Sequence, residues 1–331
     1  MKRKLISVLL CVAMVATMLI GCGSSSSEES SEEATEETTE AKDLADCKIG
    51  LSIHFKTDDY GVICSEGFEQ ACKDAGVGEY TVLDANSDAS KQLSDIESFI
   101  AGGYDAIVVS PVDDQAVKDV INKAYDKGIK VVTITYVPDA NVTSNIAAGN
   151  YDLSSEVCEK LCEAMDYKGK VALMDITTNL WRTNQRLQAF QDVIAQYPDM
   201  EVVAVEKKMT PDEAKTAAEN LITANPDLGG IFGTFSNVQY GAAAACKDAG
   251  RDDIVVGGVD ADMSILELMK DGWVKAAAAQ FPDSHGILGA EAAIKALQGE
   301  EVEDEYLAEY KIYVAGEEAT AAEEVWGKTL E

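Results

Sequence analysis

The sequence is poor in the residues that nucleic-acid binding and most hydrolytic chemistry require. Its 331 residues contain 27 lysines and arginines against 59 aspartates and glutamates, a formal net charge of −32. Such a surface repels phosphate backbones, which argues against DNA or RNA as a partner. The chain has two histidines, His54 and His285, and neither stands at a motif spacing from a nucleophile. Nucleophile-elbow, P-loop and dinucleotide-binding glycine patterns are also missing, so we expect a protein that is not an enzyme and needs no cofactor.

Apolar runs long enough to enter a membrane are scarce, and the one candidate is at the N-terminus. Residues 2–4 are basic, and residues 5–20 are nearly all apolar. This run is short for a membrane span and has the flanks of an export signal. It ends at Leu19-Ile20-Gly21-Cys22, which resembles a bacterial lipobox. That resemblance implies cleavage before Cys22 and a lipid on Cys22; an ordinary signal peptide with an incidental cysteine is the alternative.

The segment that follows Cys22 has almost no apolar residues. Residues 23–46 contain nine acidic residues and one lysine. A segment of this composition repels itself and cannot bury a core. We therefore expect a lipoprotein signal peptide over residues 1–21 and a lipid-anchored, acidic, disordered tether over residues 22–46. A disordered tail without a role is the alternative.

The remaining cysteines are expected to be core residues. An even number of cysteines in an exported chain allows disulfides. Most of them stand at apolar positions of predicted helices, where a thiol acts as a small hydrophobic group. Cys158 and Cys162 are four residues apart, as in half of a metal site, but no second ligand pair has a suitable spacing. We expect free thiols and no metal at these six positions: Cys47, Cys64, Cys72, Cys158, Cys162 and Cys246.

Strand-like and helix-like stretches alternate along the rest of the chain. Short runs rich in valine and isoleucine are separated by stretches with helical spacing, which predicts an α/β fold with parallel sheets covered by helices on both faces. The expected strands lie near residues 48–53, 80–84, 105–109, 129–134, 170–175, 201–206, 230–232, 254–259 and 309–315, with a helix near 284–298.

These strands form two matching sets. The string KIGLSI at residue 48 matches KVALMD at 170, and DAIVVS at 105 matches GGIFGT at 229. A nearly constant offset over whole strand–helix units predicts two similar doubly wound lobes joined by a three-strand hinge. Loops at the carboxyl ends of such strands face a ligand, so we expect a cleft between the lobes. The expected N-terminal lobe covers residues 47–144 plus 281–308, and the expected C-terminal lobe covers 145–280 plus 309–331.

The ordered landmarks IGLSIHFKTDDYG, VVGGVDADMSILELMKDG and AAAAQFPDSHG resemble the type I periplasmic-binding-protein family, in particular the ribose- and galactose-type receptors of ABC importers. The resemblance covers residues 47 to about 315. It implies a monomeric, extracytoplasmic receptor that captures a sugar or polyol and delivers it to a membrane permease. A receptor that feeds a chemosensory or sensor-kinase system, or that binds another small molecule, is the alternative. A transcription regulator of this fold would carry a DNA-binding domain where this chain has a lipobox.

The resemblance also implies a ligand site. Sugar hydroxyls donate and accept together, and leaving one unpaired on burial costs about 1–3 kcal/mol. Asp260 ends an apolar strand where the family has a hydroxyl-binding aspartate, and a lone buried carboxylate there would be costly without a partner. Gln280 ends KAAAAQ and matches the family's Gln or Asn at a crossing between lobes. Arg186 matches a sugar-binding arginine, with a solvated helix arginine as the alternative.

Further candidates are less specific. A surface turn is the alternative reading for the residues after the first strand, and core packing is the alternative for the tryptophan. The residues are Asp58, Asp59, Tyr60, Tyr136, Trp181, Asn184, Phe235 and Asn237. Against the ribose receptors, Thr135-Tyr136 replaces an Asp-Arg pair, Phe235 replaces an Asn, and Met209 stands at an aromatic position. These departures argue against ribose itself as the ligand.

Overall fold

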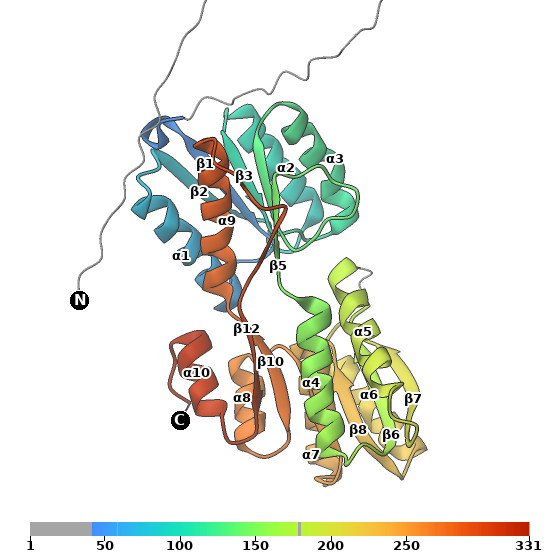
Figure 1. The fold of residues 1–331 in the computed structure, drawn as a ribbon. Helices are drawn as coiled ribbons and strands as arrows, with labels where there is room; N and C mark the ends of the chain where they lie inside the picture. Colours follow the sequence, from blue (N-terminus) through green and yellow to red (C-terminus); the bar gives the residue numbers. More distant parts are fainter. Residues whose placement is uncertain (1–41, 58, 178–179, 331) are drawn as a thin grey trace, which may run out of the picture. The chain divides into compact units, whose positions relative to one another are not determined.

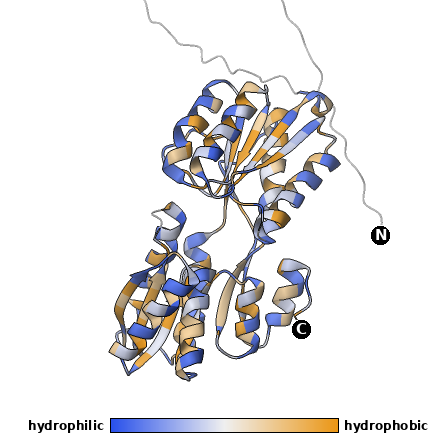
Figure 2. Cartoon of the chain, turned by 180° about the vertical axis from the view of Figure 1, so that it is seen from behind, coloured by the Kyte–Doolittle hydropathy of each residue, from blue (hydrophilic) through white to orange (hydrophobic). Residues whose placement is uncertain are grey.

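The computed structural model describes residues 42–57, 59–177 and 180–330, and it builds them around two six-stranded sheets (Figure 1). The apolar strand runs predicted from the sequence form the interior of both sheets. Colouring by hydropathy shows apolar strands between helices whose outer surfaces are hydrophilic (Figure 2). Each sheet is therefore the core of one α/β lobe, as the sequence predicted. None of the described helices is long and apolar enough to cross a bilayer.

The first sheet is entirely parallel and has the strand order β11-β5-β4-β3-β1-β2. Helices α1 (Asp59–Asp74) and α9 (Pro282–Leu297) cover one face, and α2 (Ala89–Ala101) and α3 (Asp114–Asp126) cover the other. α1 and α9 are far apart in sequence and lie side by side (Figure 1). The strands are β1 (Lys48–Ile53), β2 (Glu79–Asp84), β3 (Ala106–Val109), β4 (Lys130–Ile134), β5 (Ser144–Ala147) and β11 (Glu305–Leu307).

The second sheet has the equivalent order β12-β10-β9-β8-β6-β7 and is parallel except for the antiparallel pair β10–β12. Its strands are β6 (Gly169–Asp175), β7 (Met200–Lys207), β8 (Leu228–Gly233), β9 (Val255–Val259), β10 (Ala276–Gln280) and β12 (Tyr310–Val314). Helices α4 (Asn150–Ala164) and α5 (Trp181–Ile194) pack on one face. The other face carries α6 (Pro211–Ala224), α7 (Ser236–Ala249), α8 (Met263–Lys270) and α10 (Glu318–Trp326).

Three short strands were not expected from the sequence. β5, β10 and β11 contain few branched apolar residues, and β10 begins with four alanines, which favour helices in isolation. β5 pairs with β4 in the first sheet, so the chain leaves that sheet after Ala147 and not at the predicted residue 144. The chain returns to the first lobe between β10 and α9. It passes to the second sheet again between β11 and β12. The remaining lobe boundaries stay predictions.

The start of the described chain belongs to the first lobe. Leu44 is buried in a short 3-10 helix, Leu44–Asp46, and the Lys42 backbone N–H donates to the Leu297 carbonyl at 3.0 Å. The Lys42 ammonium also pairs with Asp105 at 2.6 Å. The prediction of a tether up to residue 46 is therefore wrong for its last five residues, because Leu44 has an apolar site to fill. The signal peptide, Cys22 and the rest of the tether lie outside the described residues.

The six cysteines are buried, in agreement with the expectation that they are core residues, and no disulfide joins any two of them. The Cys158 and Cys162 sulfurs lie 4.0 Å apart within a hydrogen bond on α4. Burial raises the pKa of Cys72 and of Cys246 to about 12. Such thiols stay protonated and unreactive at neutral pH.

Candidate functional site

A cavity of about 610 Å³ is lined by loops from the carboxyl ends of strands in both sheets. This is the edge at which doubly wound sheets bind ligands. The first lobe contributes residues after β1, β3 and β4, and the second lobe contributes residues after β8, β9 and β10 together with α5. The lining residues are His54, Thr57, Asp59, Tyr60, Ser110, Thr135, Arg182, Arg186, Phe235, Ser236, Asn237, Asp260, Ala261, Asp262, Met263, Ser264, Gln280 and Trp326.

Asp260 is the best-defined acceptor of the cavity. It follows β9 directly and has a φ of 73°, the left-handed region that few side chains other than Asn and Asp adopt readily. Gln280 Nε2 donates to Asp260 Oδ1 at 2.9 Å, and Arg186 Nη1 lies 3.5 Å from the same oxygen. Among the described residues nothing bonds to Asp260 Oδ2. Asp260 is therefore oriented by two neighbours through one oxygen and keeps the other for a ligand.

A buried glutamine of α7 holds the backbone at Asp260 by hydrogen bonds. Gln239, on α7, donates from Nε2 to the Asp260 carbonyl at 3.0 Å and to the Val259 carbonyl at 3.2 Å. Val259 is the last residue of β9, and Asp260 follows it. Gln239 thus satisfies the backbone of the turn and holds the strained Asp260 in position.

Arg186 is a buried member of the site. Its side chain is only 3% exposed, Nε donates to Asn150 Oδ1 at 2.9 Å, and Nη1 donates to the Thr234 carbonyl at 3.0 Å. Its guanidinium carbon lies 4.3 Å from the centre of the Phe235 ring. Burial lowers the pKa of Arg186, and Asp260 opposes that change. The alternative of a solvated helix arginine is therefore wrong for Arg186, because three polar partners hold its side chain inside the lobe.

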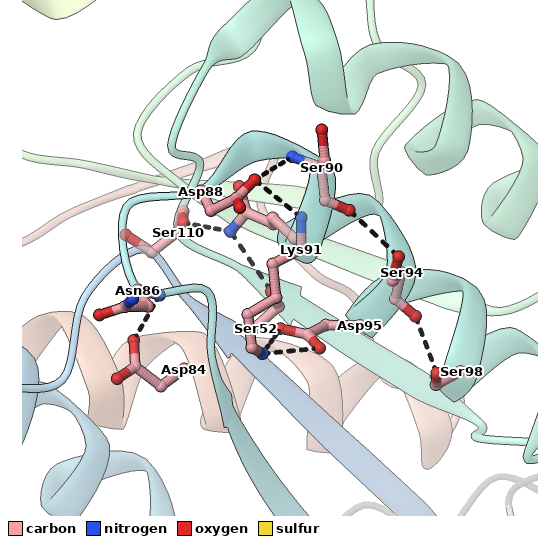
Figure 3. A network of polar contacts seen from close by, with 11 residues as sticks. Ser52, Asp84, Asn86, Asp88, Ser90, Lys91, Ser94, Asp95, Ser98 and Ser110 are labelled. Carbon is pink, nitrogen blue, oxygen red and sulfur yellow. Dashed lines mark hydrogen bonds and ion pairs between the residues drawn. The ribbon is translucent and has the colours of Figure 1, made fainter.

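The wall supplied by the first lobe is built on a buried glutamine of α2. Gln92 Nε2 donates to the Ser110 carbonyl at 2.8 Å and lies 3.3 Å from Ser52 Oγ, and its Oε1 accepts from the Val112 N–H at 2.7 Å. Figure 3 shows Ser52 and Ser110 close to α2, which begins at its N-cap Asp88. The glutamine thereby ties together the ends of β1 and β3.

His54 lies next to this wall. Its Nδ1 is 2.8 Å from Ser110 Oγ, and its ring centre is 5.7 Å from that of Tyr60. Burial, and to a lesser extent the charge of Arg182, lowers the pKa of His54 to about 3. His54 is thus neutral at physiological pH, and it offers a hydrogen bond to the cavity without adding charge.

One hydrogen bond connects α3 of the first lobe with α5 of the second. The Trp181 N–H, at the start of α5, donates to Asp114 Oδ2 at 2.8 Å. Leu180, the N-cap of α5, makes no side-chain capping bond, so Asp114 serves that end of the helix from the other lobe. The rings of Tyr136 and Trp181 lie 5.1 Å apart, centre to centre, beside this contact.

The structure brings together seven of the eleven ligand-site residues predicted from the sequence. Asp59, Tyr60, Arg186, Phe235, Asn237, Asp260 and Gln280 line the cavity. Asp59 also pairs with Lys328 at 2.7 Å. Tyr136 and Trp181 contact each other and, like the exposed Asn184, are not among the lining residues. Asp58 lies outside the described residues.

Sequence reasoning missed several cavity residues. His54 and Ser110 directly follow β1 and β3, so the rule that ligands meet strand carboxyl ends was a usable signal. Arg182, one turn before Arg186 on α5, was another. No sequence pattern predicted that Trp326 lines the cavity, because its position depends on the packing of α10 beside α8. Its indole N–H donates to the Ala261 carbonyl at 2.8 Å.

Comparison with known proteins gives matches over most of the chain. A family profile described as a periplasmic binding protein domain matches residues 49–301. The chain is 29% identical over 268 residues to a ribose import binding protein of Bacillus subtilis, covering 80% of this chain and 86% of the relative.

Solved structures show the same two-lobed fold. A sugar-binding protein of a sugar ABC transporter from Bacillus halodurans is 26% identical, with a TM-score of 0.75 and coverage of 82% of this chain and 98% of that one. An ABC transporter solute-binding protein from Actinobacillus succinogenes, solved with bound D-allose, is 24% identical, with a TM-score of 0.75 and coverage of 83% and 99%.

Proposed function

The chain belongs to the periplasmic binding protein family, and from that premise we propose that it is an extracytoplasmic receptor that binds a sugar or polyol in the cavity at Asp260. The relatives described above are named as a ribose import binding protein and a sugar-binding protein, which supports this ligand class. Asp260 carries the proposal, because its free carboxylate oxygen stands in a cavity with oriented neighbours.

The chemistry of the cavity suits a polyhydroxylated ligand. Asp260 accepts from hydroxyls, while Gln280 and the arginines donate to them, so each hydroxyl can find a partner on closure. Tyr60 and Phe235 supply aromatic faces for the C–H side of a ring. No step of bond making or breaking is required, and the protein only captures its ligand.

A thermal-shift screen tests this proposal. Pentoses, hexoses, polyols and their acidic derivatives should include a compound that raises the melting temperature, because a ligand at 100 times its Kd adds about 2.7 kcal/mol. Asp260→Ala should then weaken binding of that compound more than tenfold in calorimetry, about 1.4 kcal/mol.

The matched control is Asp248→Ala. Asp248 is an exposed aspartate paired with Lys215 on the surface, away from the cavity lining. This variant should bind as the wild type does, since exposed pairs contribute little. Wild-type affinity in Asp260→Ala would remove Asp260 from the site, and a screen without any hit would contradict the proposed ligand class.

Delivery to an ABC import permease is the second part of the proposal. A lipid on Cys22 would keep the receptor at the cell membrane, where the acidic segment after it gives the folded part reach toward a permease. The alternative is a receptor for a chemosensory or sensor-kinase system. Uptake of the ligand by cells lacking this protein separates the two, because uptake falls only if the protein feeds a transporter.

A further inference from the structure

Two arginines one turn apart on α5 line the cavity, and among the described residues only Arg186 has bonded partners. Arg186 is bonded to Asn150 and to the Thr234 carbonyl. Arg182 occupies the same helix face, since residues four apart are neighbours on a helix. Within residues 42–330, the two internal gaps apart, Arg182 has no hydrogen bond from its guanidinium and no carboxylate oxygen within 4.0 Å.

Each carboxylate around the cavity has at least one oxygen bonded to a group other than Arg182. Asp260 Oδ1 is shared by Gln280 and Arg186, and Asp59 pairs with Lys328. Asp262 caps α8 by accepting from the Ile265 N–H at 3.0 Å. Asp114, the other acidic group that acts on Arg182 electrostatically, accepts from the Trp181 N–H.

Arg182 therefore carries a positive charge that no carboxylate of the described residues contacts. Burial and repulsion from Arg186 both lower its pKa. A partly desolvated cation that lacks a partner is costly, and a ligand that supplies an anion would remove this cost. The planar guanidinium fork matches a carboxylate in a bidentate arrangement. His54 lines the cavity from the first lobe. Because its ring is neutral, it does not compete with Arg182 for an anion.

We propose that the ligand is an acidic sugar or polyol with one carboxylate, such as a uronic or aldonic acid, and that Arg182 binds this carboxylate. The inference rests on the proposed function and narrows its ligand class. One carboxylate matches the one cavity guanidinium that has no partner among the described residues. A phosphate ester would bring about two negative charges close to Asp260 and Asp262, in a protein with a net charge of −32.

Calorimetry with matched ligand pairs tests the inference. The pairs are glucuronate with glucose, galacturonate with galactose and gluconate with glucitol, and glucose 6-phosphate is added. At least one acid should bind 50-fold or more tightly than its neutral parent. Arg182→Gln, which keeps hydrogen-bond donors and removes the charge, should lower the affinity of that acid at least 20-fold and change binding of the parent less than threefold.

The control variant is Arg251→Gln, which alters a surface arginine paired with Asp253 and should bind as the wild type does. The melting temperature of Arg182→Gln without ligand should equal or exceed that of the wild type, because an uncompensated charge is removed. A fall of several degrees would mark Arg182 as a structural residue and overturn the inference.

The ligand panel also separates this inference from the proposed function. Neutral sugars that bind as tightly as their acids, or a preference for the phosphate ester, would overturn the acidic-sugar inference and leave a sugar receptor standing. A panel in which no sugar, polyol or acid binds would contradict the proposed function itself.

Discussion

His285 shows how a single buried group makes the stability of this protein depend on pH. It lies on α9 with 1% exposure, and its Nδ1–H donates to the Phe281 carbonyl at 3.1 Å. Its Nε2 is buried and has no partner among the described residues. Burial lowers the pKa of His285 from 6.5 to about 4. The native state therefore contains the neutral ring, while the unfolded chain takes up a proton below pH 6.5.

The expected consequence is a loss of stability on acidification. Between about pH 6.5 and pH 4 the unfolded state binds more protons than the native state, so the free energy of unfolding falls as the pH falls. His285→Gln keeps a donor for Phe281 and cannot titrate, so its urea midpoint should fall less between pH 7 and pH 5. His54, whose pKa is lowered to about 3, leaves a residual dependence. Equal losses in the wild type and the variant would contradict this account.

At the scale of elements, α1 and α9 pack so closely that glycine is required at their contact. A Cβ on Gly286 would lie 1.9 Å from the Cys64 carbonyl oxygen, and a Cβ on Gly67 would lie 2.6 Å from the Asp283 carbonyl oxygen. Both obstacles are backbone atoms, which cannot move aside without separating the helices. This contact joins the first helix of the lobe to the returning helix that completes it.

Gly286→Ala should therefore lower the free energy of unfolding by about 1–3 kcal/mol or more, since overpacking forces backbone shifts. Gly289→Ala, three residues further on the same helix, is the matched comparison. Its Cβ would lie 3.0 Å from a methyl group of Val108, a side chain that has some freedom to shift. Urea unfolding should show the larger loss for Gly286→Ala. The reverse order would mean that the α1–α9 contact is looser than the structure indicates.

The strands also divide at this scale into those that the sequence predicts and those that it does not. β1, β3, β4 and their counterparts β6, β8 and β9 are buried and contain mostly apolar residues and glycine, and the predicted ranges agree with the observed ones to within two residues. β10 begins with alanines and lies against Gly257, where an added Cβ would meet the Ala276 carbonyl oxygen at 2.3 Å. The alanines of β10 adopt the strand conformation through their pairing with β9 on one side and β12 on the other, which no local pattern predicts.

For the whole molecule, we propose that attachment to the cell depends on residues that precede the folded part. The order of basic residues, apolar run, Gly21 and Cys22 supports lipidation. Cys22→Ala should release the protein from the membrane fraction or leave it unprocessed, because the lipid attachment atom is gone. Fractionation of cells with an antibody to the folded part measures this, with Cys11→Ala as the control. A Cys22→Ala protein that remains lipidated would refute the anchor.

The sequence by itself determined the two α/β lobes, because buried parallel strands need continuous apolar runs and the repeat preserves their spacing. It also located Asp260 and Gln280, because strand carboxyl ends are local features. Tertiary structure alone decided which of the two arginines on α5 has hydrogen-bond partners among the described residues. Arg182 and Arg186 lie on one face of the same helix. Among the described residues, Asn150, Thr234 and Asp260 from other elements bond to Arg186, and no such group bonds to Arg182 in the cavity. Whether a buried charged side chain has a bonding partner depends on segments that are distant in the sequence, so no local sequence pattern predicts it.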